Sequence, residues 1–147
     1  MKVLTKVAHG GNPQDRTSAL VLDTCALLWW SLDPGQFSQP ALGAIEEMER
    51  NKNGITPSMA VWEIAIKVKN QKLDLGVPID IYVERLQRSD VVQIVPVDEN
   101  VLVKSVNLAW SHRDPVDRIM VALAMNNNCS IITLDSEIRK FYSQTVW

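Results

Sequence analysis

The chain has 147 residues, of which 46% are apolar and 22% charged, a composition typical of one globular domain and not of a disordered chain. Its 15 lysines and arginines against 17 aspartates and glutamates give a net charge of −2, which excludes a basic protein that holds nucleic acid by phosphate neutralisation alone. No apolar run approaches the roughly 20 residues that cross a bilayer, so we expect a cytoplasmic protein without a membrane segment.

Residues 1–18 differ from the rest of the chain. They are rich in Gly, Asn, Pro, Gln and Ser and lack hydrophobic periodicity, which predicts a flexible N-terminal tail followed by one domain over residues 19–147. The tail contains three basic residues and one acid, which leaves 12 basic and 16 acidic residues in the domain. The domain therefore carries a net charge of −4.

Short apolar runs alternate with helical patterns along the domain. The run ALVLD at residues 19–23 is typical of a strand covered on both faces. In chain order we expect a strand at 19–23, helices at 26–30 and 39–51, a short strand at 55–56, helices at 58–70 and 78–87, a strand at 91–97, helices at 99–110 and 115–125, a strand at 130–135, and a last helix that ends near residue 142. Pro96 indicates that the third strand lies at a sheet edge or ends there. This order predicts an α/β fold with a parallel sheet.

Two of the predicted strands end in an aspartate, Asp23 and Asp135. Because the functional crevice of a parallel sheet lies at the carboxyl ends of its strands, we expect both side chains at that edge. Glu63 is the only charged residue in the helical stretch SMAVWEIAI, and Asp117 lies in the first turn of the helix that begins at Pro115. We expect all four acids to converge at one edge of the sheet.

Each of these acids also has a plain structural explanation. Asp23 could cap the next helix, and Asp135 could merely mark the end of a strand. Glu63 could form an ion pair with Lys67 one turn later, and Asp117 could favour the positive end of its helix dipole. The pattern of the four acids together, and not any single acid, supports a functional site.

Four carboxylates at one edge would repel one another unless a cation neutralised them. Hard oxygen ligands of this kind favour Mg²⁺ or Mn²⁺. A metal held in this way could orient and activate a water for hydrolysis of a phosphodiester bond. Asp98 and Asp114 are left out of this set because both are explained as N-caps of the helices that follow them.

Four short motifs occur between residues 19 and 142. They are LDTCALLW at residues 22–29, the stretch 58–73 around Trp62-Glu63-Ile64, HRDPVDR at residues 112–118, and TLD at residues 133–135. Together these motifs resemble the PIN-domain family, specifically its VapC-like toxin branch. The resemblance covers nearly the whole predicted domain.

The resemblance implies a single PIN-like domain with a five-stranded parallel sheet between helices. It implies a metal-dependent endoribonuclease, a hydrolase that leaves 5′-phosphate and 3′-hydroxyl ends and belongs to a toxin–antitoxin pair. Asp23, Glu63, Asp117 and Asp135 would be the catalytic and metal-binding residues, with Mg²⁺ or Mn²⁺ as cofactor. The implied partners are RNA, a homodimeric second copy, and an antitoxin that inserts a segment near the active site.

Several polar residues near the acids are candidate RNA contacts: Thr24, Lys67, Lys72, His112, Arg113 and Arg118. Arg118 could grip a phosphate or hold a carboxylate in place, and we prefer the structural role. His112 could instead be a plain surface residue, and the lysines could belong to a solvated helix face.

Two alternative functions remain open at this point. A PIN-like domain could serve as a catalytically silent binding or regulatory protein that needs no metal. A haloacid-dehalogenase-like phosphatase also begins with an Asp after its first strand, but Cys25 stands where that family has a second Asp. For the homodimer, the apolar residues around Trp29 and Trp30 offer a possible surface.

Overall fold

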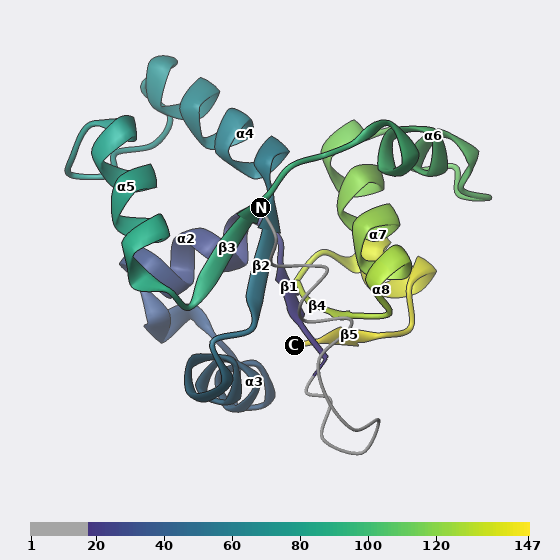
Figure 1. Ribbon diagram of the computed structural model, residues 1–147, viewed down its shortest axis with the longest axis horizontal. Helices are drawn as coiled ribbons and strands as arrows, with labels where there is room; N and C mark the ends of the chain where they lie inside the picture. Colours follow the sequence, from purple (N-terminus) through teal and green to yellow (C-terminus); the bar gives the residue numbers. More distant parts are fainter. Residues whose placement is uncertain (1–17) are drawn as a thin grey trace.

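A five-stranded parallel sheet in the order β3-β2-β1-β4-β5 forms the centre of the computed structural model, which describes residues 18–147 (Figure 1). The strands are β1 (Leu20–Leu22), β2 (Gly54–Pro57), β3 (Val92–Val95), β4 (Ser130–Ile132) and β5 (Thr145–Val146). The helices are α2 (Thr24–Leu32), α3 (Gln39–Asn51), α4 (Ser58–Lys69), α5 (Ile79–Ser89), α6 (Glu99–Asn107), α7 (Pro115–Asn127) and α8 (Ser136–Phe141), with a 3-10 turn η1 at Pro34–Gln36. The predicted α/β fold with a parallel sheet is confirmed.

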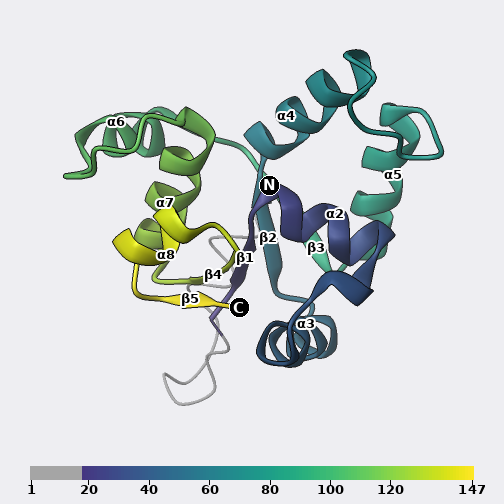
Figure 2. The same cartoon turned by 180° about the vertical axis from the view of Figure 1, so that it is seen from behind.

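Helices cover both faces of the sheet, as the two opposite views show (Figures 1 and 2). Helices α2, α3, α4 and α5 pack on one face, and α6, α7 and α8 pack on the other. The alternation of side chains along β1 explains this arrangement, because Val21 belongs to the core beneath α7 while Leu20 and Leu22 belong to the core beneath α2. All three side chains are buried, as the uninterrupted apolar run predicts.

The edge strands account for two features of the sequence. Strand β3 lies at one edge and ends at Val95, directly before Pro96, so both explanations offered for that proline hold. The opposite edge is β5, which the apolar runs do not predict. Residues 143–146 contain a single apolar residue, and a strand of two residues has too short a pattern to detect.

Helix α6 ends earlier than the sequence predicts. Its last residue is Asn107, so Leu108 and Trp110 belong to the loop that leads to α7 and not to the expected helix 99–110. The guanidinium of Arg118 donates hydrogen bonds to the carbonyls of Ser105 (2.9 Å), Val106 (3.2 Å) and Leu108 (3.0 Å). It thereby satisfies carbonyl groups that the end of a helix leaves without an intrahelical partner.

The predicted tail at residues 1–18 lies outside the described residues, except for Ser18, whose carbonyl accepts a hydrogen bond from the Asn53 side chain. The division into tail and domain therefore stays a prediction. Within residues 18–147, no helix has the length and apolar character that a membrane span needs.

Candidate active site

The four acids singled out in the sequence line one open pocket of about 250 Å³ at the carboxyl ends of the central strands. Asp23 follows β1, Asp135 lies just beyond β4, Glu63 projects from α4, and Asp117 projects from the first turn of α7. Parallel neighbours β1, β2 and β4 end at the same edge, which brings residues more than 100 positions apart into one site. The expected convergence of these acids is confirmed.

Asp23 is the most buried of the four acids, with 8% of its surface exposed. It caps α2, because its Oδ1 accepts a hydrogen bond of 2.7 Å from the amide of Ala26. Burial raises the pKa of the Asp23 carboxyl to about 6, although hydrogen bonds from Thr133 and Ala26 oppose the rise. Asp23 therefore caps α2, as one of its two explanations predicts, and it also lines the pocket.

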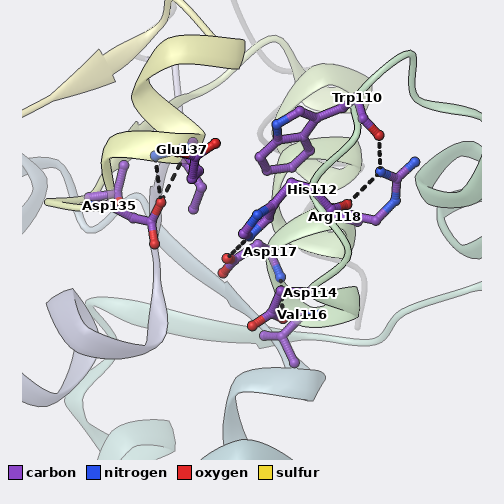
Figure 3. A network of polar contacts seen from close by, with 10 residues as sticks. Trp110, His112, Asp114, Val116, Asp117, Arg118, Asp135 and Glu137 are labelled. Atoms are coloured by element: carbon purple, nitrogen blue, oxygen red, sulfur yellow. Dashed lines mark hydrogen bonds and ion pairs between the residues drawn. The ribbon is translucent and has the colours of Figure 1, made fainter.

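The Asp117 side chain contacts a residue of the loop that precedes α7. The Nε2 atom of His112 lies 2.7 Å from Oδ2 of Asp117 (Figure 3). Burial raises the pKa of Asp117 to about 6, and the nearby charges of Asp114 and Asp135 add to the rise, whereas the hydrogen bond from His112 opposes it. The same hydrogen bond raises the pKa of the His112 imidazole.

Asp135 and Glu63 also line the pocket. The Oδ1 atom of Asp135 accepts hydrogen bonds from the amides of Glu137 (2.8 Å) and Ile138 (3.1 Å) and so caps α8. Glu63 forms the i,i+4 ion pair with Lys67 that its spacing predicts, at 3.7 Å between Oε1 and Nζ. A pair of this length on an accessible helix face contributes at most a few tenths of a kcal/mol.

The candidate RNA contacts lie in different environments. Thr24 is buried at the pocket, and its Oγ1 has no hydrogen-bond partner among residues 18–147. Arg113 is exposed in the loop before α7. Lys67 pairs with Glu63, which lines the pocket, and Lys72 lines a separate hollow between α4 and α5. The roles of these residues in RNA binding stay predictions, and Lys72 lies farther from the four acids than the predicted site implies.

The candidate role of Arg118 in substrate binding needs correction. Besides the three carbonyls at the end of α6, its Nη1 donates to the carbonyls of Trp110 (2.6 Å) and His112 (2.8 Å). The guanidinium is thus occupied by backbone acceptors, and it pairs with no carboxylate of residues 18–147. The preferred structural role is confirmed, but the group that Arg118 holds is a loop and not an acid.

Sequence reasoning missed other residues that line the pocket, namely Cys25, Trp29 and Leu134. Cys25 and Trp29 are four residues apart on α2, so the helical period from the Asp23 cap could have placed both on the pocket side. Leu134 precedes Asp135 and is 48% exposed, which no pattern in the sequence indicates. The contact between His112 and Asp117 has no sequence signal either, because it depends on the fold of a loop.

The donor set fits a hard divalent cation. Every acid offers carboxylate oxygens, and the buried Asp23 and half-buried Asp117 have raised pKa values. Thr24, whose hydroxyl has no partner among residues 18–147, lines the same pocket. However, no three His, Cys, Asp or Glu side chains among residues 18–147 converge closely enough to enclose an ion. The assignment of the four acids as metal ligands therefore stays a prediction, and Mg²⁺, which keeps several waters, needs few protein ligands.

Comparison with known proteins places this geometry in a family. Residues 20–143 match the PIN domain family. Ribonuclease VapC22 from Mycobacterium tuberculosis is 25% identical over 134 residues, which cover 88% of this chain and 99% of that protein.

Two solved structures share the fold. A toxin–antitoxin complex from Klebsiella pneumoniae has a TM-score of 0.55 at 14% identity and covers 88% of this chain and 97% of its own. FitAcB from Neisseria gonorrhoeae has a TM-score of 0.55 at 18% identity and covers 86% of this chain and 94% of its own. The family match over residues 20–143, the parallel sheet and the acids at its carboxyl edge agree with one another, and the chain belongs to the PIN-domain family.

Proposed function

We propose that this chain is a Mg²⁺- or Mn²⁺-dependent endoribonuclease and the toxin of a toxin–antitoxin pair. The observation that carries the proposal is the single pocket lined by Asp23, Glu63, Asp117 and Asp135 in a PIN-domain fold. Its similarity to Ribonuclease VapC22 supports RNA as the substrate, and its fold similarity to a toxin–antitoxin complex supports an antitoxin partner. The family assignment leaves no support for the phosphatase alternative.

The chemistry assigned to the pocket is hydrolysis of a phosphodiester bond. A bound Mg²⁺ or Mn²⁺ would activate a water and stabilise the negative charge that develops on the phosphate. Asp23 and Asp117 would bind that cation, because their burial and mutual repulsion favour a partner of opposite charge. Glu63 and Asp135, which also line the pocket, would orient waters by accepting hydrogen bonds.

The residues around the pocket would position the RNA. Arg113 is exposed beside Asp114 and can pair with a phosphate without breaking an internal contact. The Thr24 hydroxyl lies in the pocket and can donate to an oxygen of the substrate. Lys67 would add positive charge at the rim, where its ion pair with Glu63 is long and accessible.

The experiment that tests this function compares Asp117→Asn with Asp114→Asn. Both substitutions remove one negative charge near the start of α7, but only Asp117 lines the pocket, and Asn replaces Asp as a helix cap at little cost. We expect Asp117→Asn to abolish RNA cleavage and Asp114→Asn to retain it within about threefold, since capping changes alter stability more than chemistry. Chelation of the metal with EDTA should stop cleavage by the unaltered chain, and added Mn²⁺ should restore it.

The ends of the RNA products provide a second check. Attack by water with departure of the 3′ oxygen leaves a 5′-phosphate and a 3′-hydroxyl, whereas attack by the RNA 2′-hydroxyl leaves a cyclic phosphate. Cyclic phosphate ends, or full cleavage in EDTA, would contradict the proposal. A chain that binds RNA and an antitoxin equally well with and without metal, and cleaves nothing, would instead be the silent regulatory protein.

We also propose that two copies form a homodimer. The surface predicted around Trp29 and Trp30 is only partly exposed, because Trp29 packs against Phe37 and Trp147 and the Trp30 indole donates to Glu49. The large exposed apolar side chains of α4 and α6 are better candidates: Trp62, Ile66, Leu102, Val103 and Val106.

Light scattering tests this assembly directly. We expect a mass near 33 kDa, twice the 16.5 kDa of one chain, at micromolar concentration. Replacement of Val103 and Val106 by Glu should give the mass of one chain, because two charges in an apolar interface remain unpaired. Leu32→Glu, at an exposed apolar residue of α2 outside the proposed surface, is the control. A single-chain mass for the unaltered protein would contradict the dimer.

A further inference from the structure

His112 makes a direct contact with one of the pocket acids. Its Nε2 atom lies 2.7 Å from Oδ2 of Asp117, and each of the two side chains is 22% exposed. A carboxylate oxygen can only accept a hydrogen bond, so Nε2 carries the proton and donates it. The contact uses one oxygen of Asp117 and leaves Oδ1 for a ligand in the pocket.

A column of stacked rings supports His112 from behind. The His112 ring stacks on Trp110 with 4.7 Å between centroids, and Trp110 stacks on Phe141 at 4.7 Å with the planes only 9° apart. Phe141 is the last residue of α8, the helix that Asp135 caps. The column therefore connects the helix of Asp135 to the carboxylate of Asp117 and limits where the imidazole can lie. Figure 3 shows Trp110 beside the His112 ring and the contact of that ring with Asp117.

The backbone of the same loop is fixed by the residue that follows Asp117. Arg118 donates from Nη1 to the carbonyls of both Trp110 and His112. Helix α7 thus holds His112 twice, through its side chain at Asp117 and through its carbonyl at Arg118. Such a doubly held imidazole presents its Nε2–H to the carboxylate with little freedom to move.

We propose that His112 is a positioning residue, whose Nε2–H fixes the carboxylate of Asp117 so that its free oxygen faces a cation in the pocket. This proposal rests on the proposed function. An unrestrained aspartate rotates broadly about its last torsion, whereas a hydrogen bond to one oxygen selects one orientation of the other. Partners of this kind behind a metal ligand change metal affinity or activity by about 10- to 100-fold.

The test separates the hydrogen bond from the ring stack in the full chain. His112→Phe keeps a ring against Trp110 and removes the donor, whereas His112→Gln places an amide N–H near the position of Nε2 and removes the ring. Two quantities are measured for each variant: the Kd for Mn²⁺ alone, by titration without RNA, and kcat and KM with an RNA oligonucleotide that the unaltered chain cleaves. Thermal melts without metal report whether each variant folds.

We expect His112→Phe to raise the Kd for Mn²⁺ about tenfold and to lower kcat by a similar factor, with the KM for RNA within about threefold. His112→Gln should recover most of both losses. Equal defects in the two variants, or an unchanged Kd for Mn²⁺ in His112→Phe, would overturn the positioning role. Asp117→Asn is measured in parallel to distinguish failure of the positioning role from failure of the proposed function. Mn²⁺ binding and cleavage that survive in Asp117→Asn would overturn the proposed function.

Discussion

Replacement of Asp23 by Asn is expected to abolish RNA cleavage and, at the same time, to stabilise the metal-free protein. We expect the rate to fall at least about a thousandfold, because a bound metal supplies several kcal/mol of transition-state stabilisation and each 1.36 kcal/mol is a factor of ten. The helix should not suffer, because Asn accepts the amide hydrogen bond of Ala26 about as well as Asp does. The measurements are a cleavage assay and thermal melts in EDTA.

The gain in stability follows from the raised pKa of Asp23. Its value is about 6 in the folded chain against 3.8 for an ordinary aspartate, so the folded state binds the proton more tightly than the unfolded state does. The free energy of unfolding of the unaltered chain therefore falls as the pH rises from about 4 to 6, because the Asp23 proton is lost, and it does not recover above pH 6. A difference of about two pKa units corresponds to at most about 3 kcal/mol in the free energy of unfolding.

The advantage of Asp23→Asn should accordingly be small near pH 4, grow up to pH 6 and stay constant above it. Saturating Mn²⁺ should raise the melting temperature of the unaltered chain and leave that of Asp23→Asn nearly unchanged, because only the former can bind the cation. Asp98→Asn is the matched control, since Asp98 caps α6 in the same way but lies outside the pocket. If Asp23→Asn were less stable than the unaltered chain at pH 7.5 in EDTA, the raised pKa of Asp23 in the folded state would be contradicted.

Replacement of Arg118 by Lys is expected to cost about 2–4 kcal/mol in the free energy of unfolding. The guanidinium makes five hydrogen bonds to backbone carbonyls of residues 105–112, and an ammonium group has only three protons to donate. At least two carbonyls then lose their partner, at about 1–3 kcal/mol each where water cannot replace it. Urea unfolding measures the change.

The neighbouring Arg113→Lys provides the control for Arg118→Lys. Arg113 is exposed, so its replacement should change stability by no more than about 0.5 kcal/mol. Hydrogen exchange of residues 108–114 should become faster in Arg118→Lys and stay unchanged in Arg113→Lys, because only the former releases the loop. Equal stability of the two variants would mean that the carbonyls find other donors.

Local patterns in the sequence determined much of the scaffold. The uninterrupted apolar runs at residues 19–23 and 130–135 indicate strands buried on both faces, and the order of strands and helices indicates a parallel sheet. N-capping was likewise readable for Asp98 and Asp114, whose side chains accept from the amides two or three residues later. These features depend on residues near one another in the chain, which is why they can be predicted without the fold.

The convergence of Asp23, Glu63, Asp117 and Asp135 was predictable for a different reason. Parallel strands end at a common edge, so an acid that follows a strand, or lies in the early turns of a helix that starts at this edge, reaches the same place. The sequence does not indicate how many of these acids could bind one ion, because that depends on side-chain distances between α2, α4, α7 and α8. It also could not separate capping from function, since Asp23 and Asp135 do both.

The conformation of the loop before α7 depends on the tertiary structure alone. Helical periodicity predicts that the preceding helix continues to residue 110. In the structure α6 ends at Asn107, and Arg118 of α7 donates hydrogen bonds to the carbonyls at that end. The freed loop brings His112 onto Asp117 and stacks it on Trp110. The sequence by itself determined which residue types stand at the sheet edge, and only the packing of helices decided which of them touch, because contacts between loops and helices have no period along the chain.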